Sequence, residues 1–143
     1  MTARHLVRYA AVMMILSTGA ELQAAAGTHG DTDVPETVMV TLHAKPGGEA
    51  ALAGVLARHW ETARRLHLVL DAPHLTIRAT ESGNHTYFVD IFTWRDAGIP
   101  DAAPAEIRAI WNDMNRLVES RGGRPGLSIS EVTILGGGGE QRP

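Results

Sequence analysis

Hydrophobic and polar residues alternate along residues 38–44, where the sequence reads VMVTLHA. Apolar side chains at every second position are typical of a β-strand with one buried face. Lys45-Pro46-Gly47-Gly48 then forms a turn, and from residue 49 to about residue 68 the apolar residues recur at helical spacing. This spacing predicts an amphipathic helix whose buried stripe holds Leu52, Val55, Leu56, His59, Ala63 and Leu66.

Alternation typical of a strand returns after Asp71-Ala72-Pro73, at Leu75, Ile77 and Ala79, and again over residues 87–94. The sequence ESGNH between these two stretches is typical of a hairpin turn, because glycine and asparagine tolerate positive φ. The two stretches therefore predict two neighbouring antiparallel strands.

A second helix is predicted after Pro104, because a proline suits the first turn of a helix, and Gly122-Gly123 ends it. Residues 127–135 alternate once more and predict the last strand. The order β-α-β-β-α-β is ferredoxin-like, an α+β fold with an antiparallel four-stranded sheet. The stripe of the second helix holds Ile107, Ile110, Trp111, Met114, Leu117 and Val118.

The two faces of the predicted sheet follow from the register of the hairpin. A three-residue turn at residues 83–85 places Arg78 opposite Asp90 and Ile77 opposite Ile91. We expect the two helices to cover the apolar face formed by Leu75, Ile77, Ala79, Val89 and Ile91.

The opposite face carries large aromatic side chains that would be a liability if exposed in a monomer. A second copy of the same sheet is the simplest cover, so we expect a homodimer. The residues of this face are Met39, Thr41, His43, His74, Thr76, Arg78, Thr80, Phe88, Asp90, Phe92 and Trp94.

The first residues of the chain favour a targeting segment over a core helix, because the apolar run lacks a polar face. Arg4, His5 and Arg8 precede an apolar run at residues 10–20, and Ala24-Ala25-Ala26 follows, an order typical of a secretory signal peptide. The run is too short to span a bilayer, so we expect an exported protein, periplasmic or secreted, with no stable membrane anchor after cleavage. The expected divisions are a signal peptide at 1–26, a flexible lead-in at 27–36, the folded domain at 37–136 and a disordered tail at 137–143.

The composition of the chain narrows the candidate chemistry. The sequence has 143 residues, which is enough for one domain, and a formal net charge of −3, which gives no electrostatic reason to expect nucleic acid. It contains no cysteine, which excludes disulfides, thiolate metal sites and a cysteine nucleophile. Stability must therefore come from packing.

Lys45-Pro46-Gly47 ends the first predicted strand, and Trp94-Arg95-Asp96-Ala97 ends the third. With the order of elements, these motifs resemble the antibiotic biosynthesis monooxygenase (ABM) family of dimeric α/β barrels, and the C-terminal part resembles uncharacterised exported members. The resemblance implies a homodimer whose paired sheets form a barrel with the helices outside. It also implies a ligand cleft between sheet and helices. Family activities include cofactor-free oxidation of polyketide quinols and haem degradation.

The chain departs from the family pattern in two places. Family members commonly carry a histidine soon after the tryptophan motif, but residues 98–111 contain none. The haem-degrading members use an asparagine in the first strand, where this chain has Thr41 and His43. The resemblance therefore supports the fold and the dimer, and brings no complete catalytic set.

The candidate site residues are polar and aromatic side chains expected near the cleft. His43 is the candidate base and Arg78 the candidate oxyanion partner, since histidine titrates near neutral pH and arginine stays charged. Asn112 completes the catalytic candidates. His43 and Arg78 have an inert alternative as polar members of a dimer interface, Asn112 has one as a solvated helix position, and Trp94 has one as a core residue. The substrate-binding candidates are Trp94, His74, Trp111 and Phe92.

His59 lies on the apolar stripe of the first helix and is interpreted as a core histidine. No spacing among the histidines predicts a metal site, and no cofactor is expected. Three functions remain open: a cofactor-independent monooxygenase acting on a small hydrophobic or aromatic substrate, a non-catalytic ligand-binding or structural dimer of the cell envelope, and a haem-handling protein.

Overall fold

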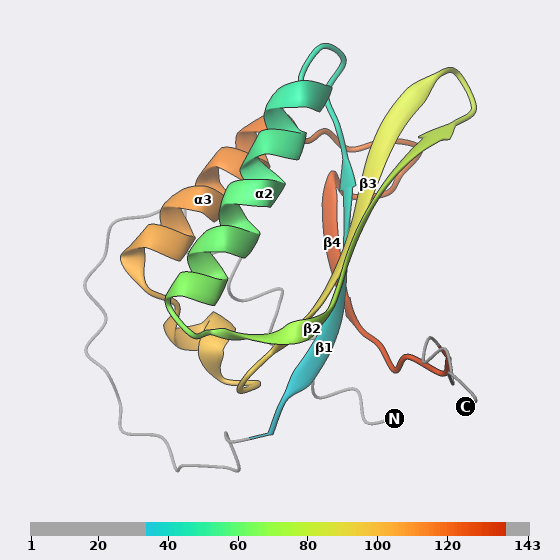
Figure 1. Ribbon diagram of the computed structural model, residues 1–143. Coiled ribbons are helices and arrows are strands. Elements are labelled where there is room, and N and C mark those ends of the chain that lie inside the picture. The colour runs from blue at the N-terminus through green and yellow to red at the C-terminus, as the bar shows by residue number, and fades with distance from the viewer. Residues whose placement is uncertain (1–33, 137–143) are drawn as a thin grey trace, which may run out of the picture.

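The computed structural model describes residues 34–136; the predicted signal peptide, most of the lead-in and the tail lie outside them. The elements follow the predicted β-α-β-β-α-β order, and the sheet is antiparallel and four-stranded, in the order β2-β3-β1-β4 (Figure 1). The strands are β1 (Glu36–His43), β2 (Val69–Glu81), β3 (His85–Trp94) and β4 (Leu127–Glu131), and the helices are α2 (Glu49–Arg65), η2 (Ile99–Ala102) and α3 (Ala105–Leu117).

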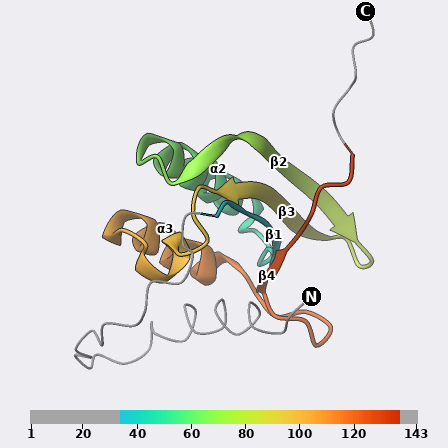
Figure 2. The same ribbon diagram turned by 90° about the horizontal axis from the view of Figure 1, so that it is seen from below.

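Both helices bury the stripes that the sequence predicts. In α2 the buried side chains recur at helical spacing from Leu52 to Ala63, and His59 is among them. In α3 the buried residues are Ile107, Ile110 and Met114, whereas Trp111 and Leu117 are half-buried. The helix ends at Leu117, before the predicted stop at Gly122-Gly123, because Val118 is already extended and pairs with Ala44. The helices pack side by side on one side of the sheet (Figures 1 and 2).

The predicted hairpin register is wrong by two residues. Glu81 pairs with His85, so the turn is residues 82–84, and Asn84 has a φ of 58° within it. Thr76 therefore lies opposite Asp90, and Arg78 lies opposite Phe88. The predicted Arg78–Asp90 pair does not form. The physical reason is that the last residue of a three-residue hairpin loop is usually left-handed, a conformation that Asn84 adopts here with less strain than His85 would.

The prediction of which face the helices cover is also wrong. The aromatic residues of β3 lie under the helices: Phe88 and Phe92 are 3% and 2% exposed, and they pair with Leu42 and Val38 of β1. Ile77, expected in the core, is 41% exposed. Both faces are apolar, so alternation alone does not choose between them. The helices cover the face with the aromatic side chains, since large rings bury the most area.

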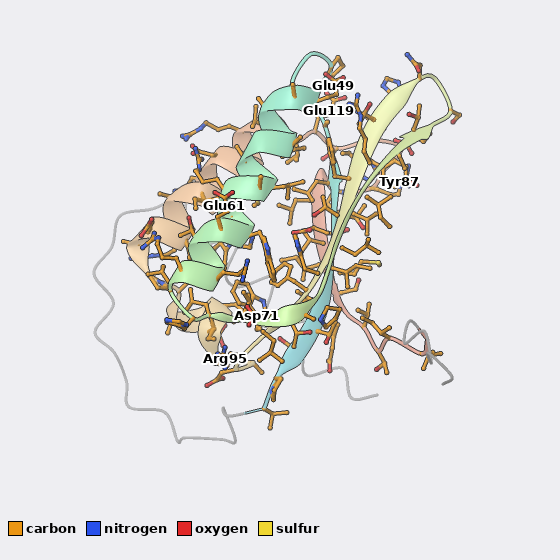
Figure 3. The ribbon with its side chains drawn as sticks, in the orientation of Figure 1. Glu49, Glu61, Asp71, Tyr87, Arg95 and Glu119 are labelled. Carbon is orange, nitrogen blue, oxygen red and sulfur yellow. The ribbon has the colours of Figure 1, made fainter. Side chains whose placement is uncertain are left out.

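The other face of the sheet, called here the open face, is covered by no helix or strand among the described residues, although His43 and Thr93 at its two ends are buried. Tyr87 projects from it, on the side of the sheet turned away from α2 in Figure 3. Thr37 and Thr93 are hydrogen-bonded across it at 2.7 Å between their hydroxyls. Its apolar members are Met39, Leu75, Ile77, Val89 and Ile91.

The edge strands differ in length from their predictions. β4 ends at Glu131, four residues before the predicted end, although the Val132 N–H still donates to the Thr37 carbonyl. β2 begins at Val69, with an irregularity in its pairing between Val69 and His74. His74 therefore follows directly after the irregular stretch.

The connection from α3 to β4 is held by ion pairs and one close backbone approach. Arg121 contacts Glu81 at 3.0 Å and Glu119 at 2.9 Å, and it donates to the Ala44 carbonyl. The Gly126 carbonyl accepts the His43 N–H at 2.8 Å. A Cβ at Gly126 would lie only 2.8 Å from the Glu119 backbone, so only glycine fits there.

Gly126→Ala is expected to lower the free energy of unfolding by about 1–3 kcal/mol, because backbone must move to admit the methyl group. Gly54→Ala is the matched control: it lies within α2, where an added methyl group would meet no atom within 4 Å, so it should raise stability by about 0.5–1 kcal/mol. Chemical denaturation measures both. Equal effects of the two substitutions would contradict the close approach.

Candidate functional site

A narrow cleft lies between the sheet and the two helices. Its volume is about 40 Å³, and its walls are almost entirely apolar. Two titratable side chains, His59 and Asp90, line it among aliphatic and aromatic groups. Its lining residues are Val38, Val40, Leu56, His59, Asp90, Phe92, Trp94, Pro100, Trp111, Met114, Leu127 and Ile129.

The aromatic walls of the cleft come from β3 and α3. Phe92 and Trp94 meet edge to face with ring centroids 4.9 Å apart, and Trp94 meets Trp111 in the same way at 6.3 Å. Such pairs are favoured by the charge distribution of aromatic rings. Trp111 is half-buried, as are Leu127 and Ile129 of β4, so the cleft is least enclosed between α3 and the short strand β4.

His59 projects from α2 into this aromatic surrounding and is 4% exposed. The Trp111 Nε1–H donates to His59 Nε2 at 3.2 Å, which leaves the ring proton of the neutral imidazole on Nδ1. Burial lowers the pKa of His59 to about 4, with a smaller contribution from nearby His74. The imidazole is therefore neutral at pH 7 and held in one orientation.

Asp90 is the second polar group of the cleft and lies on β3, 1% exposed. The Thr76 hydroxyl donates to its Oδ1 at 2.6 Å, and His74 Nε2 lies 3.3 Å from the same oxygen. Burial raises the pKa of Asp90, while the contacts with Thr76 and His74 act in the opposite direction. A carboxylate with a raised pKa is a better proton acceptor than an exposed one.

The structure brings together three of the four predicted substrate-binding residues: Phe92, Trp94 and Trp111 line the cleft. The fourth, His74, lies behind Asp90 and does not line it. The catalytic candidates are elsewhere. Arg78 is exposed on β2, and Asn112 is half-buried on α3 without lining the cleft.

His43, the predicted base, lies at the end of β1 and outside the cleft. It is 3% exposed, its Nδ1 is 3.4 Å from Glu81 Oε1, and that nitrogen has no hydrogen-bond partner within the described residues. The expectation that His43 and Arg78 line one pocket is wrong, because the two residues lie on opposite faces of the sheet. β1 turns its even-numbered residues to the cleft, so His43 faces away from it, whereas Arg78 pairs with Phe88 on the face that the helices cover.

Sequence reasoning did not select His59 or Asp90 as site residues. The signal for Asp90 was present: it is a lone carboxylate between Phe88 and Phe92 on the stripe of β3 that the helices cover. The signal for His59 was its place on an apolar stripe, which fits a core histidine equally well. Their meeting in one cleft depends on tertiary packing.

Among residues 34–136 there is no group of three histidine, cysteine, aspartate or glutamate side chains arranged to hold a metal ion. Within the same range, the helices are too short or too polar to cross a membrane.

His59 makes the stability of the protein sensitive to acid. Its pKa falls from 6.5 to about 4 on folding, so its stabilising contribution is present above pH 6.5 and is lost as the pH falls towards 4. The expected loss is about 3 kcal/mol in the free energy of unfolding. Denaturation curves at several pH values measure it.

The control is His59→Gln, which keeps an acceptor for the Trp111 N–H but does not titrate. Comparing the two proteins also removes the opposing contribution of Asp90, which both contain. An equal loss of stability in the variant would show that His59 is not the titrating group.

Comparisons with known proteins support the fold. A solved structure of a Bacteroides thetaiotaomicron protein, provisionally assigned as an antibiotic biosynthesis monooxygenase, is similar to this chain with a TM-score of 0.51 and 17% identity, covering 76% of this chain and 96% of that one. A protein of unknown function from Nitrosomonas europaea matches with a TM-score of 0.45 and 21% identity, covering 75% and 95%. No known family profile and no curated protein matches the chain. The first of these similarities supports the ferredoxin-like fold of this chain, which is similar to that of the Bacteroides thetaiotaomicron protein.

Proposed function

We propose that this protein is an ABM-type monooxygenase that oxidises a small aromatic hydroxy compound, such as a quinol, without a cofactor. The observation that carries the proposal is the cleft: aromatic walls enclose a neutral histidine and a buried carboxylate. Apolar pockets with a few convergent polar groups are typical of small-molecule sites. The ABM-like fold of the Bacteroides thetaiotaomicron structure supports the same assignment.

The chain's own groups suit the first step of such a reaction. Asp90 would accept the proton of the substrate hydroxyl, and the resulting electron-rich anion would supply the electrons that reduce O₂. One oxygen atom would enter the substrate and the other would leave as water. Phe92, Trp94 and Trp111 would hold the ring, and His59 would hydrogen-bond its polar edge.

The cleft must widen to accept such a molecule. Its volume of about 40 Å³ is far below the roughly 300 Å³ of a typical ligand pocket. The half-buried rim between α3 and β4 is where the walls are least constrained. We therefore propose that the substrate enters there by displacement of Trp111 and the facing side chains of β4.

Oxygen uptake with a hydroxylated dihydroanthracene tests the function. The wild-type protein should consume oxygen and form the quinone, and Glu61→Gln, a change on the exposed side of α2, should leave the rate unchanged (Figure 3). Saturable binding without oxygen uptake would instead support a non-catalytic ligand-binding protein. Absence of both binding and uptake would contradict the proposal.

We also propose that a second copy of the chain covers the open face. Leu75 is 51% exposed and Ile77 is 41% exposed, next to the half-buried Val89 and Ile91, so an apolar patch continues across β2 and β3. Such a patch is a liability in a monomer. The dimeric barrel of the family that the sequence resembles buries the corresponding face.

Ile77→Glu is expected to convert the dimer to a monomer, because it places two charges in the buried interface. Sedimentation at micromolar concentration measures the change. Thr80→Glu is the matched control on the opposite face of the same strand and should leave the dimer intact. A wild-type protein that sediments as a monomer would contradict this proposal.

Export is the remaining part of the proposal. The basic, apolar and alanine-rich order of residues 1–26 supports a cleaved signal peptide and a periplasmic or secreted location. The N-terminal sequence of the protein purified from its source should then begin near residue 27. A chain that retains Met1 and stays in the cytoplasm would contradict export.

A further inference from the structure

Asp90 lies between the cleft and a histidine that reaches solvent. The carboxylate is 1% exposed, whereas the His74 side chain on the neighbouring strand is 24% exposed. His74 Nε2 lies 3.3 Å from Asp90 Oδ1, and His74 does not line the cleft. The imidazole is thus the titratable contact of Asp90 on the side away from the cleft.

The orientation of His74 is fixed by two neighbours. Its ring stacks on the Trp60 ring with centroids 3.7 Å apart and an angle of 9° between the planes. Thr76 contacts both groups: its hydroxyl lies 3.3 Å from His74 Nε2 and 2.6 Å from Asp90 Oδ1. The stack and the hydroxyl keep Nε2 directed at the carboxylate.

We propose that His74 is a proton relay, which carries the proton accepted by Asp90 out to solvent. The inference rests on the proposed function for its role in turnover, although the pairing with Asp90 does not. Asp90 is otherwise enclosed, so a proton taken from a substrate needs a path that does not pass back through the apolar cleft. The geometry supplies that path in one step.

The transfer is balanced in protons and bonds, because the water formed from O₂ takes up one proton from solvent for each proton that His74 releases. The Asp90 carboxyl gives its proton to His74 Nε2, which forms an imidazolium, and the Nδ1–H then passes its proton to water. The carboxylate is regenerated and the ring is left neutral with its proton on Nε2. Return of the ring to the other tautomer through solvent makes Nε2 an acceptor again.

Two other titratable groups lie near His74. His59 is close enough for the two histidines to interact electrostatically, but it is neutral at pH 7 and adds no charge there. The Arg64 guanidinium lies 5.8 Å from the centre of the Trp60 ring, on which His74 stacks.

The pairing is tested first without any substrate. We expect the carboxyl ¹³C resonance of Asp90 to titrate in two steps in the wild-type protein, since neighbouring groups that share a proton titrate jointly. His74→Ala should reduce this to one step, and His85→Ala, which removes a histidine of the hairpin, should retain both. An Asp90 titration that is the same with and without His74 would overturn the relay.

The second test measures turnover and chemical rescue. His74→Ala should lower the rate of oxygen uptake about 10²-fold at neutral pH, and free imidazole in the buffer should restore much of it. A purely structural role would give a loss that imidazole does not repair, and an unchanged rate would likewise overturn the relay. If the wild-type protein consumes no oxygen, the proposed function is wrong. The titration of Asp90 then still shows whether His74 and Asp90 share a proton.

Discussion

Asp90→Asn is expected to lower oxygen uptake by about 10²- to 10⁴-fold, the range that a positioned general base contributes. The amide has nearly the shape of the carboxyl group but cannot accept the substrate proton. The buried position and raised pKa of Asp90 make it the acceptor that the cleft offers. The effect is the ratio of the oxygen-uptake rates of the wild-type and variant proteins, measured at the same saturating substrate concentration.

The loss should not arise from unfolding. The folded pKa of Asp90 lies above its ordinary value of 3.8, so its stabilising contribution is present below pH 3.8 and is lost as the pH rises through the folded pKa. The amide of Asp90→Asn does not titrate, so the variant should be at least as stable as the wild type at neutral pH. A variant that stays folded and retains full activity would exclude Asp90 as the base.

Phe92→Ala is expected to lower the free energy of unfolding by about 3–5 kcal/mol, the usual cost of removing a buried aromatic ring. Phe92 is 2% exposed and contacts both His59 and Trp94. Ile77→Ala on the open face is the control and should cost less than about 1 kcal/mol in the isolated subunit. Urea denaturation at a protein concentration that favours monomers compares them.

These two substitutions also decide which face the helices cover. A larger loss for Ile77→Ala than for Phe92→Ala would mean that the face predicted from the sequence is the buried one. The arrangement with Phe88, Phe92 and Trp94 under the helices gives the opposite order.

The local patterns in the sequence predict the elements well, because each depends on neighbours a few residues apart. The stripe of α2 is confirmed from Leu52 to Ala63 and that of α3 at Ile107, Ile110 and Met114, as is the β-α-β-β-α-β order. The ends of β2 and β4 are less predictable, since edge strands are terminated by contacts with other elements and not by their own spacing.

The faces of the sheet could not be predicted in the same way. Strand alternation fixes which residues share a face, and that part holds for β2 and β3. Which face meets the helices depends on the relative volumes of two apolar surfaces. One face carries Leu75 and Ile77, and the other carries the larger side chains Phe88, Phe92 and Trp94. The face with the larger side chains is the one buried under the helices.

Only part of the candidate site could be predicted from the sequence. Aromatic residues near the end of a strand and on a helix stripe, such as Trp94 and Trp111, could be selected because both elements were predicted. His59 on α2 and Asp90 on β3 line the same cleft although they lie far apart in the chain. No spacing rule brings those residues together, so the polar groups of the cleft become visible only once the helices are packed on the sheet.

A crystal structure of the protein with a bound anthraquinone, a stable product analogue, tests most directly whether the cleft between the sheet and the helices is the ligand site. We predict the ring between Trp94 and Trp111, an oxygen within hydrogen-bond distance of Asp90 or His59, and α3 moved away from β4. A closed, empty cleft with the quinone bound instead on the open face, beside Leu75 and Ile77, would contradict this assignment.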